Sequence, residues 1–149
     1  MYIKLSNILI EPKSLISYFG VLPLLFVYID IYKSHLFDLD LLKNFIIFYC
    51  LIIFTFIGAM RWDFNRKSYF VDVLYGFLPS LISSILIFLT LSGINHILIY
   101  LYIILCFILQ LIVDYFYSQL KHKEKYFFLV VRLPVTLIII FSLCYLIIV

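Results

Sequence analysis

The chain has 149 residues, of which 66% are hydrophobic and 13% charged, with a mean hydropathy of +1.20 and a net charge of +3. This apolar content exceeds what a soluble domain of this length can bury, so lipid is the expected solvent. The basic residues flank apolar runs and form no long cluster, which argues against nucleic acid as a partner. Because the apolar runs are continuous rather than alternating, they predict membrane-spanning helices and not a barrel.

Five segments approach the roughly 20 apolar residues that a helix needs to cross a bilayer. The predicted spans are residues 14–31, 41–60, 71–91, 97–117 and 126–149. The connections between them are short, so consecutive helices are expected to pack as antiparallel neighbours in one membrane domain over residues 1–149. The fold class predicted is all-α, an integral membrane bundle of five transmembrane helices.

The distribution of Lys and Arg predicts the orientation of these spans. With five spans, nine basic residues fall on one face and only Lys33 and Lys43 on the other. Basic residues are retained on the cytoplasmic or matrix side. We therefore expect the N-terminus inside and the C-terminus outside.

The odd-numbered spans each contain a proline near the predicted inner end, at Pro23, Pro79 and Pro134. Each proline frees a carbonyl four residues earlier, at Phe19, Tyr75 and Val130, and neighbouring groups must satisfy that carbonyl. The first two sites share a Gly-x-Leu-Pro-like pattern. It is interpreted either as the trace of a duplicated helical hairpin or as a coincidence between sequences built from few, mostly apolar residue types.

Small residues form a stripe along the third span, at Gly76, Ser80, Ser83 and Ser84. Such a stripe lets helix backbones approach closely in lipid. A lining for a polar cavity is the functional alternative, although Ser hydroxyls commonly bond to carbonyls one turn back.

The fourth and fifth spans hold the sharpest polar constellation of the sequence. Asp114 and Arg132 are equally distant in sequence from Lys123, so they are expected at the same depth. Gln110 and Thr136 lie one turn deeper on the same two faces, which predicts a polar ladder between the helices. A structural ion pair is the favoured interpretation; Arg132 reaching to anionic headgroups and a substrate or proton site are the alternatives.

A second polar cluster, Arg61-Trp62-Asp63, ends the second span, and Asp72 begins the third. A charged mouth on the inner face is the functional interpretation of this cluster. The simpler interpretation is that Trp62 is an interfacial anchor and that Arg61 is a charge that sets the topology.

Several of these residues resemble, in order and spacing, one family of small membrane proteins. They are Gly20 to Pro23, Phe56 to Trp62, Pro79 to Ile82, Asp114, Arg132 and Thr136. The similarity is to the domain-of-unknown-function family that includes transmembrane protein 69, with members in alphaproteobacteria, related bacteria and mitochondria. The resemblance implies five helices and an inner membrane, bacterial or mitochondrial. The family pattern Gly-Gly-Ile-His-Trp-Gly carries Arg61 here in place of its His and Asp63 in place of its final Gly, so no role of that His is transferred.

Catalytic and metal-binding motifs are not found in the sequence. Cys50, Cys106 and Cys144 make no CxxC pair, and there is no Gly-rich phosphate loop and no HExxH. Haem ligation by His35 and His96 stays open, but neither residue lies within a predicted span. We expect no enzyme activity, no cofactor and no metal.

The sequence therefore favours a non-catalytic inner-membrane protein whose partners are the lipid bilayer and other membrane subunits. The expected role is an accessory subunit or assembly helper of an energy-converting, respiratory complex. The alternative is a small carrier or channel that uses the inner-face charges and the prolines. The residues expected to matter are Gly58, Arg61, Trp62, Pro79, Ser80, Gln110, Asp114, Arg132 and Thr136.

Overall fold

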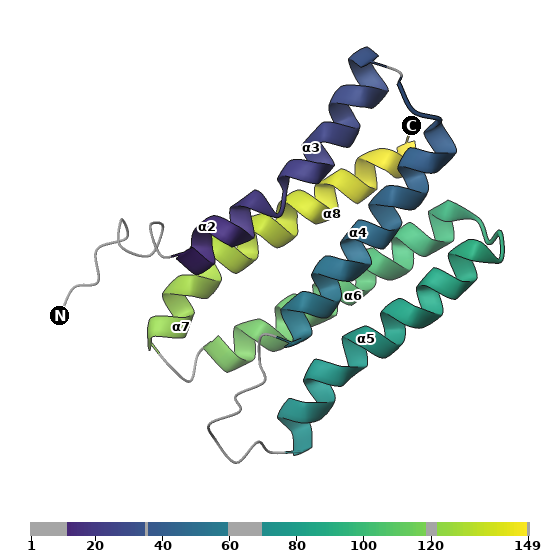
Figure 1. Cartoon of the computed structure of the whole chain (residues 1–149). Helices are drawn as coiled ribbons and strands as arrows, with labels where there is room; N and C mark the ends of the chain where they lie inside the picture. Colours follow the sequence, from purple (N-terminus) through teal and green to yellow (C-terminus); the bar gives the residue numbers. More distant parts are fainter. Residues whose placement is uncertain (1–11, 35, 60–69, 119–121, 149) are drawn as a thin grey trace. The chain divides into compact units, whose positions relative to one another are not determined.

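Five helices in the described part of the chain are long and apolar enough to cross a membrane (Figure 1). The computed structural model describes residues 12–34, 36–59, 70–118 and 122–148. The spans are Ser14–Lys33, Leu39–Ala59, Val73–Leu91, His96–Phe116 and Lys125–Ile148. The expected all-α fold with five transmembrane helices is confirmed, and the chain is an integral multi-pass membrane protein. Its orientation in the membrane stays a prediction.

The chain divides into two compact units. The first comprises Met1–Phe37 and Ile104–Val149, so it holds the first span, the larger part of the fourth and the fifth. The second, Asp38–Ile103, holds the second and third spans and the first turns of the fourth. The single domain expected from the short connections stays a prediction.

In the first unit, the first span is interrupted just before Pro23. Helix α2 (Pro12–Phe19) ends before Gly20, and α3 (Leu22–Ile29) carries the proline in its first turn. A proline at that position costs little, because the first N–H groups of a helix have no partner within the helix. The interruption therefore accommodates Pro23 without an unpaired turn inside a helix.

The first span ends in a π-helix, η1 (Asp30–Ser34), whose first residue is a buried carboxylate. The Asp30 carboxylate accepts hydrogen bonds from the backbone N–H groups of Leu36 and Phe37, each at 3.2 Å. A charge-assisted bond of this kind satisfies donors that no helix satisfies. Asp30 thus fixes the chain as it leaves the first span.

The last span contains a second π-helix directly before its proline. It comprises α7 (His122–Phe127), η2 (Phe128–Arg132) and α8 (Leu133–Ile148). Pro134 stands at the second position of α8, and the Tyr18 hydroxyl donates a hydrogen bond to the Val130 carbonyl four residues before it. The prediction that a neighbouring group satisfies this carbonyl is confirmed.

Two more tyrosines of the first span bond to the last span at higher levels. The Tyr28 hydroxyl donates to the Ser142 carbonyl at 2.6 Å, and the hydroxyls of Tyr32 and Tyr145 are hydrogen-bonded to each other. We call the bonds of Tyr18, Tyr28 and Tyr32 the tyrosine ladder. It joins the first and last spans along most of their length.

In the second unit, α4 (Leu39–Ala59) and α5 (Phe70–Leu91) run side by side (Figure 1). Helix α5 continues through Pro79, so the motif shared with the interrupted first span adopts two conformations. Gly93, with a φ of +80°, makes the turn that leads to α6 (His96–Ser118). This left-handed conformation is one that glycine adopts without steric cost.

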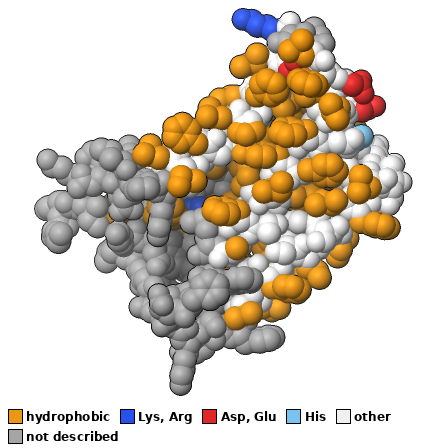
Figure 2. Space-filling view, in the orientation of Figure 1, with side chains coloured by type: hydrophobic (Ala, Val, Ile, Leu, Met, Phe, Trp, Pro, Cys, Tyr) orange, Lys and Arg blue, Asp and Glu red, His pale blue; other side chains and the backbone are white. Residues whose placement is uncertain are grey.

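Every span exposes large apolar side chains, as a lipid-facing surface requires. Figure 2 shows hydrophobic side chains spread over the described surface in that view. One phenylalanine of each span is 59–69% exposed: Phe19, Phe56, Phe88, Phe116 and Phe141. In water such a surface would cause aggregation, whereas in hydrocarbon it carries no penalty.

Candidate functional site

Two candidate residues, Gly58 and Pro79, lie against each other where α4 meets α5. Gly58 is buried near the end of α4, and a Cβ added to it would lie 2.6 Å from Cγ of the Pro79 ring. Real Cβ atoms essentially never approach a neighbour that closely. The absence of a side chain at Gly58 therefore makes room for the proline ring.

Hydroxyl groups continue this contact along the same two helices. The hydroxyls of Thr55 and Ser83 lie 3.0 Å apart, and both are within hydrogen-bond distance of the Leu51 carbonyl, at 3.0 and 3.2 Å. The stripe predicted on the third span thus contributes Gly76 and Ser83 to buried positions. Tight helix packing is the interpretation that these contacts support.

Ser80, another candidate, is only partly buried on α5. Its carbonyl accepts a hydrogen bond from the exposed Ser84 hydroxyl at 2.9 Å, one turn further along. This is the local bonding expected for serine in a membrane helix. The bond lies within α5 and joins no second helix.

Asp114 and Arg132 are brought together, as their equal distance from Lys123 predicts. Asp114 lies on α6 four residues before its end, and Arg132 is the last residue of η2. The Arg132 Nε and an Asp114 carboxylate oxygen are 3.8 Å apart, with side chains 15% and 10% exposed. Opposite charges at this separation attract each other, so the pair joins the fourth and fifth spans.

The residues predicted one turn deeper are both buried. Gln110 is 5% exposed and Thr136 4% exposed. Gln110 lies four residues before Asp114, and Thr136 lies four residues after Arg132. Each is on the same face of its helix as that charged residue. A polar stripe therefore runs inward from the Asp114–Arg132 pair on both helices.

Arg61, Trp62 and Asp63 lie outside the described residues. His35 also lies outside them, while the His96 Nε2 contacts the Asn44 Oδ1 at 3.0 Å. His96 is thus engaged within the second unit, between α4 and α6.

Three structurally important side chains were not singled out from the sequence: Tyr18, Asp30 and Thr55. The position of Pro134 predicted an acceptor at Val130, but 13 tyrosines are distributed over the chain and no spacing identifies the donor. A lone acid such as Asp30 near a span end is typical of a loop, and nothing in the local sequence indicates its burial.

Within the described residues, no group of three or more His, Cys, Asp and Glu side chains is arranged to hold a metal ion. The polar contacts found there join helices to one another, cap their ends or lie within one helix. Chemically, this arrangement stabilises a membrane-embedded scaffold.

A family model matches nearly the whole chain. Residues 10–148 match a family model described as "Protein of unknown function (DUF3429)". No curated protein and no solved structure matches the chain. The uncharacterised family expected from the sequence is thereby confirmed, while the link to transmembrane protein 69 stays a prediction.

Proposed function

The chain belongs to the DUF3429 family of proteins of unknown function, and from this premise we propose that it is a non-catalytic accessory subunit or assembly helper of an energy-converting membrane complex. The complex is a respiratory one in a bacterial or mitochondrial inner membrane. In this role the protein performs no reaction of its own. It presents helices to other subunits.

The observation that carries the proposal is that polar residues inside the spans join helices to one another. Asp114 pairs with Arg132, and the Thr55 and Ser83 hydroxyls meet between α4 and α5. Polar groups in hydrocarbon are costly unless they serve a purpose, and here that purpose is to join helices. A scaffold fixed in this way suits a protein that acts by contact.

The exposed surface supports the same proposal. Large apolar side chains lie exposed along all five spans. Helices of neighbouring subunits pack on such surfaces in a membrane through van der Waals contact and small residues. The surface is therefore compatible with lipid and with other subunits alike.

The test is gentle purification from the native membrane, with an affinity tag at the C-terminus, followed by mass spectrometry of the intact complex. Recovery in fixed stoichiometry with respiratory subunits is expected. Deletion of the chain is expected to lower the amount of that assembled complex on native gels. Recovery alone or as a homo-oligomer, with every respiratory complex intact after deletion, would contradict the proposal.

A cysteine-accessibility experiment separates this role from that of a carrier. In a background that lacks Cys50, Cys106 and Cys144, new cysteines at Gln110 and Thr136 are expected to stay unreactive to aqueous thiol reagents, because both positions are buried. Ser92, exposed after the end of α5, is the matched positive control. Labelling at Gln110 and Thr136 at the rate of Ser92 would indicate a solvated path and redirect the work to flux assays.

A further inference from the structure

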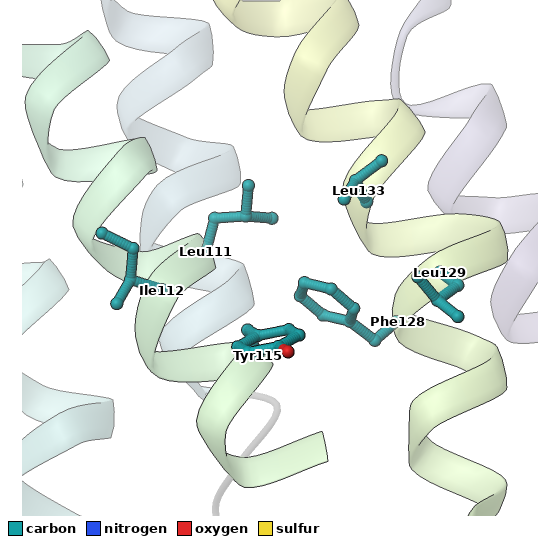
Figure 3. A pocket seen from close by; sticks show the side chains of 6 residues that line it. All are labelled: Leu111, Ile112, Tyr115, Phe128, Leu129 and Leu133. Carbon is teal, nitrogen blue, oxygen red and sulfur yellow. The ribbon is translucent and has the colours of Figure 1, made fainter. Parts of the chain in front are cut away.

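An apolar groove lies between the fourth and fifth spans in the first unit (Figure 3). Helix α6 supplies one wall, and η2 with the start of α8 supplies the other. The lining residues are Leu111, Ile112, Tyr115, Phe128, Leu129 and Leu133. Figure 3 shows the Phe128 ring reaching across toward Tyr115, so the two walls meet at that level.

A π-helix bond lies in one wall of this groove, and the ion pair joins the two walls. In η2 the Leu133 backbone N–H donates to the Phe128 carbonyl five residues earlier, which places Phe128 and Leu133 on one side. Asp114 and Arg132 immediately precede Tyr115 and Leu133 in sequence, and their 3.8 Å contact ties the two walls together. The ion pair therefore holds the two walls of the groove close to each other next to Tyr115 and Leu133.

The groove fits a hydrocarbon chain. Its volume is about 280 Å³, which far exceeds the roughly 10–15 Å³ that holds one water molecule in the same measure. A methylene group has a volume similar to that of water, and water is not retained where the lining is apolar. A helix is about 10 Å across and does not enter such a space.

A basic residue marks the end of the groove nearest the predicted inner face. Lys125 is exposed and lies three and four residues, or about one helical turn, before the lining residues Phe128 and Leu129. Anionic lipids are attracted to basic residues beside transmembrane helices on that side of a membrane. We propose that the groove binds one acyl chain of an anionic glycerophospholipid, whose headgroup phosphate contacts the Lys125 ammonium.

The experiment is a lipid titration of the whole detergent-purified protein, followed by native mass spectrometry. Wild-type protein is expected to retain phosphatidylglycerol more tightly than phosphatidylcholine. Leu129→Trp fills the groove from a side chain that is 48% exposed, and Leu105→Trp is the matched control at 51% exposure on α6 outside the groove. In Leu129→Trp the lipid is expected to lose the burial of about two methylenes, which weakens its binding about tenfold. Lipid binding by the Leu105→Trp control is expected to stay unchanged.

The headgroup contact is tested separately with Lys125→Gln. A basic residue near a membrane surface contributes about 1 kcal/mol to anionic lipid binding, so the preference for phosphatidylglycerol is expected to fall about fivefold. The control is Lys33→Gln, because Lys33 lies on the predicted outer face. This variant is expected to keep the preference for phosphatidylglycerol. Equal retention of both lipids by wild-type protein would overturn the proposal.

A photoreactive phosphatidylglycerol covers the case in which Leu129→Trp does not fold. Cross-linking to wild-type protein is expected to concentrate in the peptides that contain Tyr115 and Leu129. Cross-links spread evenly over all five spans would indicate ordinary bilayer contact and no site. Equal binding by a folded Leu129→Trp variant and its Leu105→Trp control would overturn the proposal just as directly.

Discussion

The two compact units hold their helices together by different physical means. In the second unit, α4 and α5 approach so closely at Gly58 that the Pro79 ring occupies the space of a missing side chain. In the first unit, the first and last spans are joined by tyrosine hydroxyls that reach backbone carbonyls. Small residues allow close helix packing in the second unit, whereas long tyrosine side chains connect the helices in the first unit.

The difference is clearest at the prolines. Helix α5 continues through Pro79, whose ring packs on the neighbouring helix, whereas the carbonyl before Pro134 accepts a hydroxyl from the first span. A close pair has no room to adjust, so it is sensitive to added volume. A pair bridged by long side chains is sensitive to the loss of a single polar atom.

The largest effect is expected at the ion pair of the first unit. Asp114→Asn leaves a mostly buried guanidinium without its carboxylate, and the free energy of unfolding is expected to fall by about 3 kcal/mol. Unfolding is measured in detergent by steric trapping. The double variant Asp114→Asn/Arg132→Met removes both charges and is expected to recover most of that loss. If Asp114→Asn and Arg132→Ala each leave stability and protein level unchanged, the pair has no structural role.

The close contact of the second unit is tested by added volume. Gly58→Ala places a Cβ 2.6 Å from the Pro79 ring, and such overpacking costs about 1–3 kcal/mol. Thermal unfolding is followed through the reaction of the buried Cys50 with a thiol dye, in a background with Cys106 and Cys144 replaced by Ala.

A double-mutant cycle identifies the cause of that loss. If the ring is the obstacle, Gly58→Ala costs much less in a Pro79→Ala background, because the two changes share one contact. Equal costs in both backgrounds would place the strain elsewhere on α4.

The tyrosine ladder is tested by removing one oxygen atom. Tyr18→Phe leaves the Val130 carbonyl without the hydroxyl, and the expected loss of stability is about 1–2 kcal/mol. In a Pro134→Ala background the new backbone N–H supplies a donor within the helix, so Tyr18→Phe is expected to cost less there. An equal cost in both backgrounds would show that the ladder does not compensate for the proline.

Sequence reasoning predicted the parts of the molecule that follow from hydropathy and from local covalent constraints. Span positions follow from the length of apolar runs, and the acceptor at Val130 follows from Pro134 alone. That Asp114 and Arg132 lie at the same depth and meet follows from counting residues on either side of the short connection between their helices. All three depend on sequence distance.

What it did not predict depends on the rotation of helices about their axes. The choice of Tyr18 as donor, and of Thr55 as the partner of Ser83, is set by which faces meet. Because most residues of these spans are apolar, nearly every helix face is apolar, so hydropathy does not fix that rotation. The two π-helices also shift register by an amount that the sequence does not show.

The smallest effect is expected at the hydroxyl contact, and it sharpens the contrast between the two units. Ser83→Ala removes a hydroxyl shared with Thr55 and Leu51, and helix-joining bonds in membranes contribute about 0.6 kcal/mol on average. Ser84→Ala is the matched control, because its bond stays within α5 and its loss is expected to leave stability unchanged. Both are measured as the free energy of unfolding by steric trapping. Equal effects at the two positions would mean that packing at Gly58 alone holds this pair, since the hydroxyls between the helices would then add nothing beyond a local bond.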